Sequence, residues 1–317
     1  MFLRFATRFT TFLFTFFISI CVFGQKNLVK TTINQPSFCD HGYYTLVFKD
    51  EFEGSELDTN KWQTYYPYGD NVRKDSCSFC RTHVTANIYR DENCSVKDGL
   101  LRLKSDVARG EWFGKTYEYT SGLVHSRQIF TTYGKYEIRC KLPKGKQQWP
   151  AFWIFGWNTE IDVFEFICRG TEKVEFSVHK WLKTGCDNKK ANKGGPCYSN
   201  QSKIVEFGID FSEEFHTFSM EYEPHLIKFY IDDVMVRVVP KYYDAKKKPV
   251  YHCPLKPGVY YEDPAFPIPG EPVHVIANQS VCWKIREKNP VFPNYLEIDY
   301  IRVFQKTIQP DLVEKVP

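Results

Sequence analysis

Short runs of β-branched and aromatic residues, separated by Gly, Pro, Asn and Asp, recur along most of the chain. Runs of this kind are typical of β-strands, and no window shows a long helical period. Turn signals at Asp98-Gly99 and Asp232-Asp233 predict tight turns between neighbouring runs. The pattern predicts an all-β protein, built as a two-sheet antiparallel β-sandwich of jelly-roll type. The expected strands are Tyr43–Phe48, Ser121–Phe130, Gly134–Leu142, Trp149–Phe155, Ile161–Ile167, Val174–Trp181, Phe215–Glu223, Leu226–Ile231, Val234–Val239, Val273–Ala277 and Leu296–Phe304.

One of these apolar runs contains three carboxylates, Glu160, Asp162 and Glu165. Successive side chains of a strand point to opposite faces, so Glu160 and Asp162 share a face while Glu165 is one residue out of step. A β-bulge at Val163 and Phe164 would return Glu165 to the face of the other two acids. The sequence therefore predicts three acids on one wall.

Three carboxylates in one partly desolvated site cannot all ionise at low cost, so at least one is expected to hold a proton. A retaining glycosidase uses such a pair: a deprotonated carboxylate attacks the anomeric carbon and a protonated one donates to the leaving oxygen. We predict Glu160 as the nucleophile, Glu165 as the acid/base and Asp162 as the residue that orients the nucleophile. The alternative is an ordinary strand whose acids face solvent.

Tryptophans are frequent near this strand. Sugar rings stack on indole through their C–H faces, so tryptophans are expected in a polysaccharide groove, and core packing is the alternative for each of them. His179, on the next expected strand, either assists the proton balance of the acids or is a structural histidine. The candidate substrate-binding tryptophans are Trp149, Trp153, Trp157, Trp181 and Trp283.

The first 24 residues have the features of a secretory signal. Arg4 and Arg8 precede an apolar run from Phe9 to Phe23, with a cleavage position before Gln25. A membrane anchor is a competing interpretation, although the run is short for a spanning helix, and lipidation at Cys21 is another. We expect a secreted, periplasmic or cell-surface protein without stable membrane insertion after cleavage. The predicted division is a signal peptide (1–24), a polar leader (25–37), one large domain (38–308) and a C-terminal tail (309–317).

Charge and cysteine content narrow the function class. The net charge of +4 does not point to nucleic acid, and two of these charges lie in the first 24 residues. Ten of the eleven cysteines follow residue 24, an even number that fits disulfides in an oxidising compartment. Cys186 and Cys197 bracket a polar loop and are the expected local pair. Cys77-Ser-Phe-Cys80 suggests zinc, but no second close pair accompanies it, so a disulfide or free thiols are preferred.

Several segments together resemble glycoside hydrolase family 16, the laminarinase, agarase and lichenase group. The resemblance covers most of the chain after residue 24, and the acidic motif in this order and with these flanks is specific. The resembling segments are Leu46–Phe52, Tyr119–Gly122, Tyr133–Arg139, Leu142–Gly145, Trp149–Trp153, Glu160–Glu165, His179 and Glu297–Val303.

The resemblance implies a β-jelly roll with a concave substrate cleft, residues 38–308 as the catalytic domain, and retaining, endo-acting hydrolysis of a β-linked polysaccharide. It implies the same roles for the three acids as the residues themselves indicate. The spaced Glu-x-Asp-x-x-Glu form is similar to the bulged branch of laminarinases and agar- or carrageenan-active enzymes. No cofactor is required for this chemistry. Some members carry a structural calcium, for which Glu51 or Glu53 with Asp299 would supply oxygen ligands here.

Two departures from the family pattern flank the acids. Trp157-Asn158-Thr159 stands where laminarinase-like members have a Pro and a Gly, and Asn278–Trp283 stands where they have Asn-x-Ala-x-Gly-Gly. By the same likeness Asn278 is a further candidate for substrate binding. The sequence therefore leaves a β-1,3-glucan and an algal galactan open as substrates of a monomeric hydrolase. A non-catalytic, lectin-like glycan-binding protein and a transglycosylase are the alternative functions.

Overall fold

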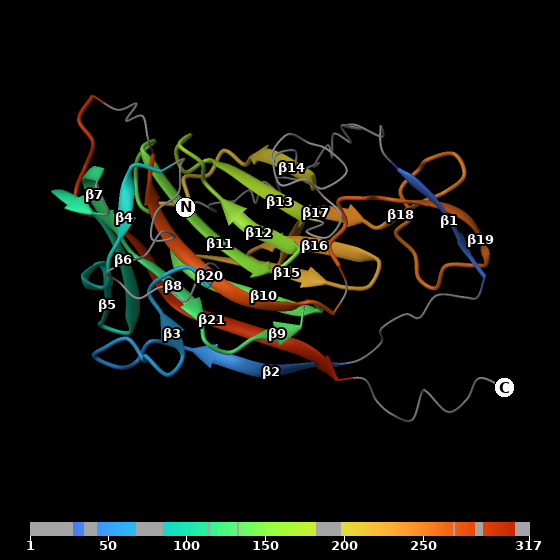
Figure 1. Cartoon of the computed structure of the whole chain (residues 1–317), viewed down its shortest axis with the longest axis horizontal. Helices are drawn as coiled ribbons and strands as arrows, with labels where there is room; N and C mark the ends of the chain where they lie inside the picture. The colour runs from blue at the N-terminus through green and yellow to red at the C-terminus, as the bar shows by residue number, and fades with distance from the viewer. Residues whose placement is uncertain are drawn as a thin grey trace, which may run out of the picture.

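The computed structural model describes residues 28–34, 43–67, 85–112, 115–131, 133–181, 198–268, 270–282 and 288–307. These residues form two large sheets and one small sheet, which lies at one end of the molecule (Figure 1). Among them there is no α-helix, and the 3-10 turn η2 (Asp91–Asn93) is the one helical element. The predicted all-β, two-sheet sandwich is confirmed.

The larger of the two main sheets has ten strands. Its central strand β21 pairs with β10 on one side and with β6 and β2 on the other. β4 and β7 run parallel, whereas the other neighbours in this sheet run antiparallel. In order, the strands are β17 (Val234–Pro240), β16 (Leu226–Ile231), β15 (His216–Tyr222), β10 (Gly134–Lys141), β21 (Asn294–Thr307), β6 (Leu100–Trp112), β7 (Lys115–Ser121) and β4 (Asn87–Tyr89), with β2 (Tyr43–Asp50) beside β21 and β5 (Cys94–Lys97) beside β6.

Two hairpins of this sheet have the turns that the sequence predicts. Lys97 pairs with Leu100 across Asp98 and Gly99, which have φ angles of 56° and 75°. The hairpin of β16 and β17 turns in the same way through Asp232 and Asp233, with φ angles of 48° and 62°. Positive φ at both central residues is the type I′ geometry, which Asp and Gly tolerate better than most residues.

The second main sheet has eight strands and carries the acidic motif. β11 is in its middle, between β12 and β20, and β13 and β14 continue the sheet beyond β12. In order, the strands are β14 (Tyr198–Glu206), β13 (Lys173–Trp181), β12 (Thr159–Glu165), β11 (Gln148–Gly156), β20 (Pro272–Val281), β8 (Leu123–Ser126) and β3 (Trp62–Gln63), with β9 (Phe130–Thr131) beside β20.

The main hydrophobic core fills the space between the two sheets. Ile161, Val163 and Phe164 of β12 all belong to it, together with residues of β10, β15 and β21 from the opposite sheet. The Phe164 and Phe218 rings lie 4.6 Å apart across the interface, a separation typical of packed aromatic pairs. Since the apolar residues of β12 face this core, its carboxylates face the outer surface of the eight-stranded sheet.

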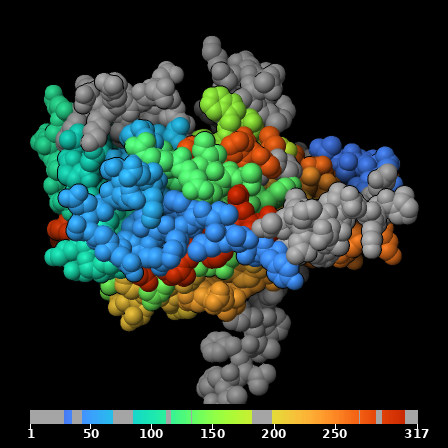
Figure 2. All heavy atoms as spheres, turned by 90° about the horizontal axis from the view of Figure 1, so that it is seen from below, coloured from blue at the N-terminus to red at the C-terminus, as the bar shows by residue number. Residues whose placement is uncertain are grey.

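Two stretches expected to lack strands contain them. The polar leader includes β1 (Val29–Ile33), and the stretch between the expected strands Val234–Val239 and Val273–Ala277 includes β19 (Gly258–Glu262). These two strands pair with each other, and β19 also pairs with β18 (Tyr242–Tyr243), which gives the small sheet. Figure 2, seen from below, shows residues 43–67 spread in blue over one side of the sandwich, with the small sheet projecting beyond it.

Among the described cysteines, two form a disulfide with each other and two are free thiols. Cys168 is bonded to Cys282, and Cys253 is disulfide-bonded as well. Cys94 and Cys140 are free, so the even count did not mean that every cysteine is paired. No helix among the described residues is both long and apolar enough to span a bilayer. The expected signal peptide, the pair Cys186 and Cys197, and the motif Cys77-Ser-Phe-Cys80 lie outside the described residues.

Candidate active site

The predicted bulge is present in β12. On β13, Ser177 pairs with Asp162 and Glu175 pairs with Glu165, so two steps along β13 match three steps along β12. The register with β11 shifts at the same place and leaves Val163 as the extra residue. A bulge of this kind resets the alternation of side chains. The three acids therefore share the face of β12 that is turned away from the main core.

The three carboxyls lie close together in a partly dehydrated place. Asp162 is only 2% exposed, and Glu160 and Glu165 on either side of it are half-buried. Burial, and then the charge of Asp162, raise the pKa of both glutamates well above the ordinary value. Each of these glutamates therefore takes up a proton more readily than a glutamate in water, which is what a proton donor at neutral pH requires.

His179 connects the acids to β14. Its Nε2 donates to Asp162 Oδ2 at 3.0 Å, and its Nδ1 lies 2.6 Å from the Tyr198 hydroxyl. A carboxylate only accepts, so Nε2 carries a hydrogen, and in the neutral ring Nδ1 accepts from Tyr198. Burial, followed by the nearby carboxylates, raises the pKa of Tyr198 to about 12, so its hydroxyl keeps its proton. The result is a continuous chain from Tyr198 through His179 to Asp162.

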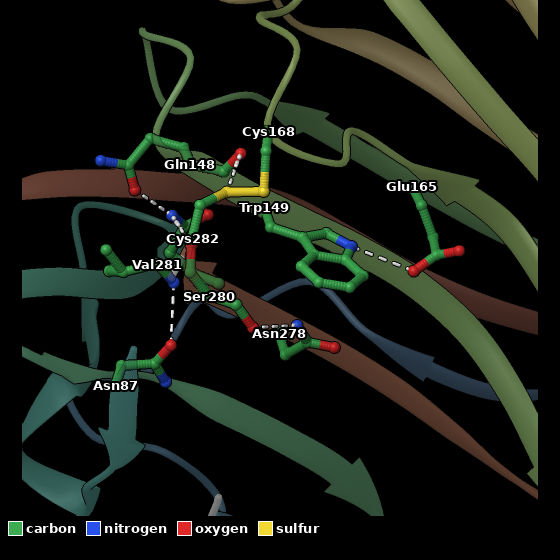
Figure 3. The surroundings of a disulfide bond; sticks show 10 residues. Asn87, Gln148, Trp149, Glu165, Cys168, Asn278, Ser280, Val281 and Cys282 are labelled. Atoms are coloured by element: carbon green, nitrogen blue, oxygen red, sulfur yellow. Dashed lines mark hydrogen bonds between the residues drawn. A yellow bond between two sulfur atoms is a disulfide. The ribbon is translucent and has the colours of Figure 1, made fainter. Parts of the chain in front are cut away.

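Two tryptophans of β11 donate hydrogen bonds on this face. Trp149 Nε1 donates to Glu165 Oε1 at 3.0 Å (Figure 3). Trp153 Nε1 donates to Asn278 Oδ1 at 2.8 Å, and Asn278 in turn donates to Ser280 Oγ at 3.0 Å. Both indoles are therefore fixed in orientation by polar partners.

Aromatic rings border the acids on both sides. On β13 and β14, His179, Trp181 and Tyr198 are stacked with ring centroids 5.6–5.8 Å apart. On the other side, a second apolar cluster separate from the main core covers β11, β20 and β8. Its buried members are Tyr66, Tyr89, Leu123, Ala151, Trp153 and Ile276, and Phe155 packs against them. The half-buried rings of His179, Trp181 and Tyr198 leave flat apolar surface beside the carboxylates, of the kind that a sugar ring needs, and the buried cluster supports the opposite side.

The structure brings most of the predicted substrate-binding residues to this face. Trp149, Trp153, Asn278, His179 and Trp181 belong to strands β11, β20 and β13 and meet through the contacts described above. The contacts described above do not include Trp157. Trp157 lies on the turn between β11 and β12 with 66% of its surface exposed, and Trp283 lies outside the described residues.

The residues predicted to hold calcium pair with arginines instead. Glu51 accepts two hydrogen bonds of 2.9 Å from Arg302, and Asp299 accepts one from Arg139. Because each carboxylate is already neutralised by a guanidinium, these two residues do not fit a cation site as they stand. The calcium stays a prediction. Among the described residues, the potential metal-ligand atoms that do lie close together belong to Glu160, Asp162 and His179. These atoms are within 4.8 Å of one another.

Sequence reasoning missed several residues that shape this site. Tyr198 belongs to β14, whose mixed polar sequence shows no clear alternation. Glu175 faces Glu165 and binds Arg169 at 2.8 Å, and only the alternation of β13 could have placed it there. Cys282 was visible as one of the residues that replace the family's glycines, but its partner could not be read from the sequence.

The chain is similar to polysaccharide hydrolases in both sequence and fold. The model of glycosyl hydrolases family 16 matches residues 82–261. A glucan endo-1,3-beta-glucosidase of Cryptopygus antarcticus is 30% identical over 212 residues, which are 62% of this chain and 70% of the relative. A glucan endo-1,3-beta-glucosidase A1 of Niallia circulans is 27% identical over 323 residues, which are 92% of this chain and 43% of that longer protein.

Among solved structures, the catalytic domain of an endo-1,3-beta-glucanase (laminarinase) from Thermotoga petrophila is similar with a TM-score of 0.61 and 26% identity. The match covers 84% of this chain and the whole of that domain. The laminarinase catalytic domain of Thermotoga maritima gives a TM-score of 0.60 at 25% identity. The similarity thus extends over most of the sandwich and over both sequence and fold.

Proposed function

Because the chain belongs to glycosyl hydrolases family 16, a family of glycosidases, we propose that it is a retaining endo-hydrolase of a β-1,3-glucan that acts outside the cytoplasm. The observation that carries this proposal is the bulge in β12, which sets Glu160, Asp162 and Glu165 on one face between two groups of aromatic rings. A double displacement needs one ionised carboxylate that attacks and one carboxyl that keeps its proton, and two buried glutamates whose charges oppose each other favour that division.

In the first step, a carboxylate oxygen of Glu160 attacks the anomeric carbon while the bond from that carbon to the glycosidic oxygen breaks. Glu165 gives its proton to the leaving oxygen, and the sugar stays on Glu160 as an ester. In the second step, Glu165 takes a proton from a water molecule, the water oxygen attacks the anomeric carbon, and the ester bond to Glu160 breaks. Two inversions leave the β configuration unchanged.

Three neighbouring residues influence which of the two glutamates, Glu160 or Glu165, carries the proton. Asp162 lies next to Glu160, and its charge opposes a second charge on either glutamate. His179 donates to Asp162, which keeps that carboxylate in place as the orienting group of Glu160. Trp149 donates a hydrogen bond to the Glu165 carboxyl and holds it in position to protonate the leaving oxygen. These residues supply all the acid and base chemistry of the proposal, so it uses no cofactor.

The substrate class is inferred from the relatives and from the surface. Two relatives and two solved neighbours are described as endo-1,3-beta-glucosidases or laminarinases. The half-buried indoles of Trp149 and Trp181 give neutral, flat contacts that suit an uncharged glucan, whereas Trp153 packs beneath this face. Action outside the cytoplasm is supported by the signal-like first 24 residues and by the disulfide between Cys168 and Cys282.

The test is a reducing-end assay with laminarin, lichenan, agarose, porphyran and carrageenan as substrates. We expect laminarin to be cut internally, and proton NMR of the first product to show the β-anomer. Glu160→Gln should abolish turnover while laminarin still binds, as measured by calorimetry. Binding without any turnover by the unmodified protein would indicate a lectin-like function, an α-anomer would refute the covalent intermediate, and products longer than the substrate would indicate transglycosylation.

A further inference from the structure

The disulfide between Cys168 and Cys282 lies beside the proposed acid/base. Cys168 comes three residues after Glu165, and Cys282 directly follows β20. The strand between β12 and β20 is β11, so the disulfide joins the two neighbours of β11 across its first residues. Figure 3 shows the disulfide next to Trp149, with the indole extending from there toward Glu165.

Both cysteines are bonded to the backbone that precedes Trp149. The Cys282 amide donates to the Gln147 carbonyl at 2.8 Å, and the Cys168 amide lies 3.4 Å from the Gln148 carbonyl. The Gln148 side chain is buried on the other face, where it accepts from Ser105 at 2.9 Å. The cysteines therefore clamp the start of β11 from its two sides, immediately before the residue that reaches the acid.

Few hydrogen bonds join β11 to the end of β12 at this point, and the Phe166 amide supplies one of them to the Pro150 carbonyl at 3.1 Å. Pro150 has no amide hydrogen to donate, so the ladder loses a bond just beyond Glu165. The bond from Cys168 to Gln148 is long for a backbone hydrogen bond. Cys168 also has a φ of 54°, a left-handed conformation that favours glycine or asparagine over cysteine. A cysteine in such a position is explained by the bond that it makes.

We propose that Cys168 and Cys282 are positioning residues, whose disulfide keeps the indole N–H of Trp149 on the carboxyl of Glu165. This rests on the proposed function, in which Glu165 is the acid/base. The disulfide takes the position of the first of the two glycines that the resemblance leads one to expect after Asn278. The disulfide is thus a covalent link between the strands on either side of Trp149.

The hydrogen bond from Trp149 affects the protonation of Glu165. An N–H donor favours the charged carboxylate, so the bond from Trp149 lowers the pKa of Glu165 against the larger effect of burial. If the indole moves away, that pKa rises further. The other titratable or charged groups around this carboxyl are Glu160 and Asp162 of β12, Glu175 of β13, Tyr198 of β14 and Arg169 of the following turn, and His179 of β13 is bonded to Asp162.

The experiment compares the pH dependence of kcat/KM for four proteins: the unmodified protein, C168S/C282S, W149F, and the triple variant that combines them. The matched control is C94A, which removes a cysteine that is free and outside the site. The basic limb of the pH profile reports the pKa of the acid/base residue, which must be protonated to act as the acid. Loss of a hydrogen bond to a charged group corresponds to about one to two pH units, so we expect the basic limb of W149F to move upward by roughly that amount.

If the disulfide acts through Trp149, C168S/C282S moves the basic limb in the same direction, and the triple variant shows no further shift beyond W149F. An unchanged basic limb in C168S/C282S, or a shift that adds fully to that of W149F, would overturn the proposal. A merely structural disulfide would lower the thermal unfolding temperature and leave the pH profile where it was. If the unmodified protein has no activity on laminarin, the proposed function fails instead.

A second measurement covers the case in which C168S/C282S does not fold. The unmodified protein is titrated with dithiothreitol at the assay temperature, and mass spectrometry after alkylation follows which cysteines have opened. The basic limb should move in proportion to the opening of Cys168 and Cys282. A profile that stays constant while this disulfide opens, in a protein that is still folded, would equally overturn the proposal.

Discussion

Deleting Val163 tests whether the bulge matters only because it returns Glu165 to the face of the other acids. Without Val163 the strand reads Glu-Ile-Asp-Phe-Glu, in which strict alternation already puts all three acids on one face. The partners on both sides would then match step for step, because Phe176 of β13 lies between the partners of Asp162 and Glu165. We therefore expect the deletion variant to fold and to remain active.

The cost of the deletion follows from the burial of the lost side chain. Val163 is 1% exposed and packs in the main core, and burying a valine stabilises a protein by about 1.5–3 kcal/mol. For a domain of this size, 1 kcal/mol changes the melting temperature by roughly 2–4 °C. A loss of about 2 kcal/mol therefore predicts a melting temperature about 4–8 °C below that of the unmodified protein.

The assay is kcat/KM on laminarin at a temperature well below both transitions. Glu165→Gln gives the baseline, because it removes the acid without moving the backbone, and Val163→Ala is the matched control that keeps the bulge. The deletion variant should exceed Glu165→Gln at least tenfold. A deletion variant that melts within the expected range but is as inactive as Glu165→Gln would refute the reasoning, since alternation alone would then not place the acid.

Three further predictions concern one of the acids, Glu160, and two residues near them, Tyr198 and Trp153. Tyr198→Phe removes the hydroxyl bonded to His179; loss of one hydrogen bond of about 0.5–1.5 kcal/mol predicts a roughly 2–10-fold lower kcat with KM unchanged, and a change in KM alone would contradict it. The folded pKa of Glu160 is raised, so its carboxyl costs stability as pH rises above its ordinary value of 4.5. Glu160→Gln should therefore melt higher than the unmodified protein at pH 8 but not at pH 4; equal melting temperatures at pH 8 would count against the burial of this charge. Trp153→Phe leaves the buried Asn278 oxygen without its donor, which predicts a loss of about 1–3 kcal/mol in urea unfolding, and an unchanged midpoint would contradict it.

The parts of the structure that the sequence predicts are those with a local cause. The alternation in β12 and the misplaced Glu165 are enough to infer the bulge, because only one residue separates the two registers. The I′ turns at Asp98-Gly99 and Asp232-Asp233 follow from residues that tolerate positive φ. For such features a short window of sequence contains all the physical information.

The parts that the sequence does not predict depend on partners far along the chain. β14 has a polar, irregular sequence and becomes a strand because β13 supplies nine residues of pairing. β1 forms by pairing with β19, more than two hundred residues later. The disulfide partner of Cys282 is 114 residues away, and ten cysteines allow far too many pairings to choose among. Which tryptophans face the acids likewise depends on how whole strands are ordered in the sheet.

The position of β21 has a consequence for how this protein is made. Residues 294–307 are the last strand described, yet they lie between β10 and β6 and also pair with β2. During synthesis on the ribosome, the strands on either side of that gap emerge long before the strand that joins them. The sandwich therefore closes only after residues 294–307 have emerged, and until then its unpaired edges need protection from other nascent chains.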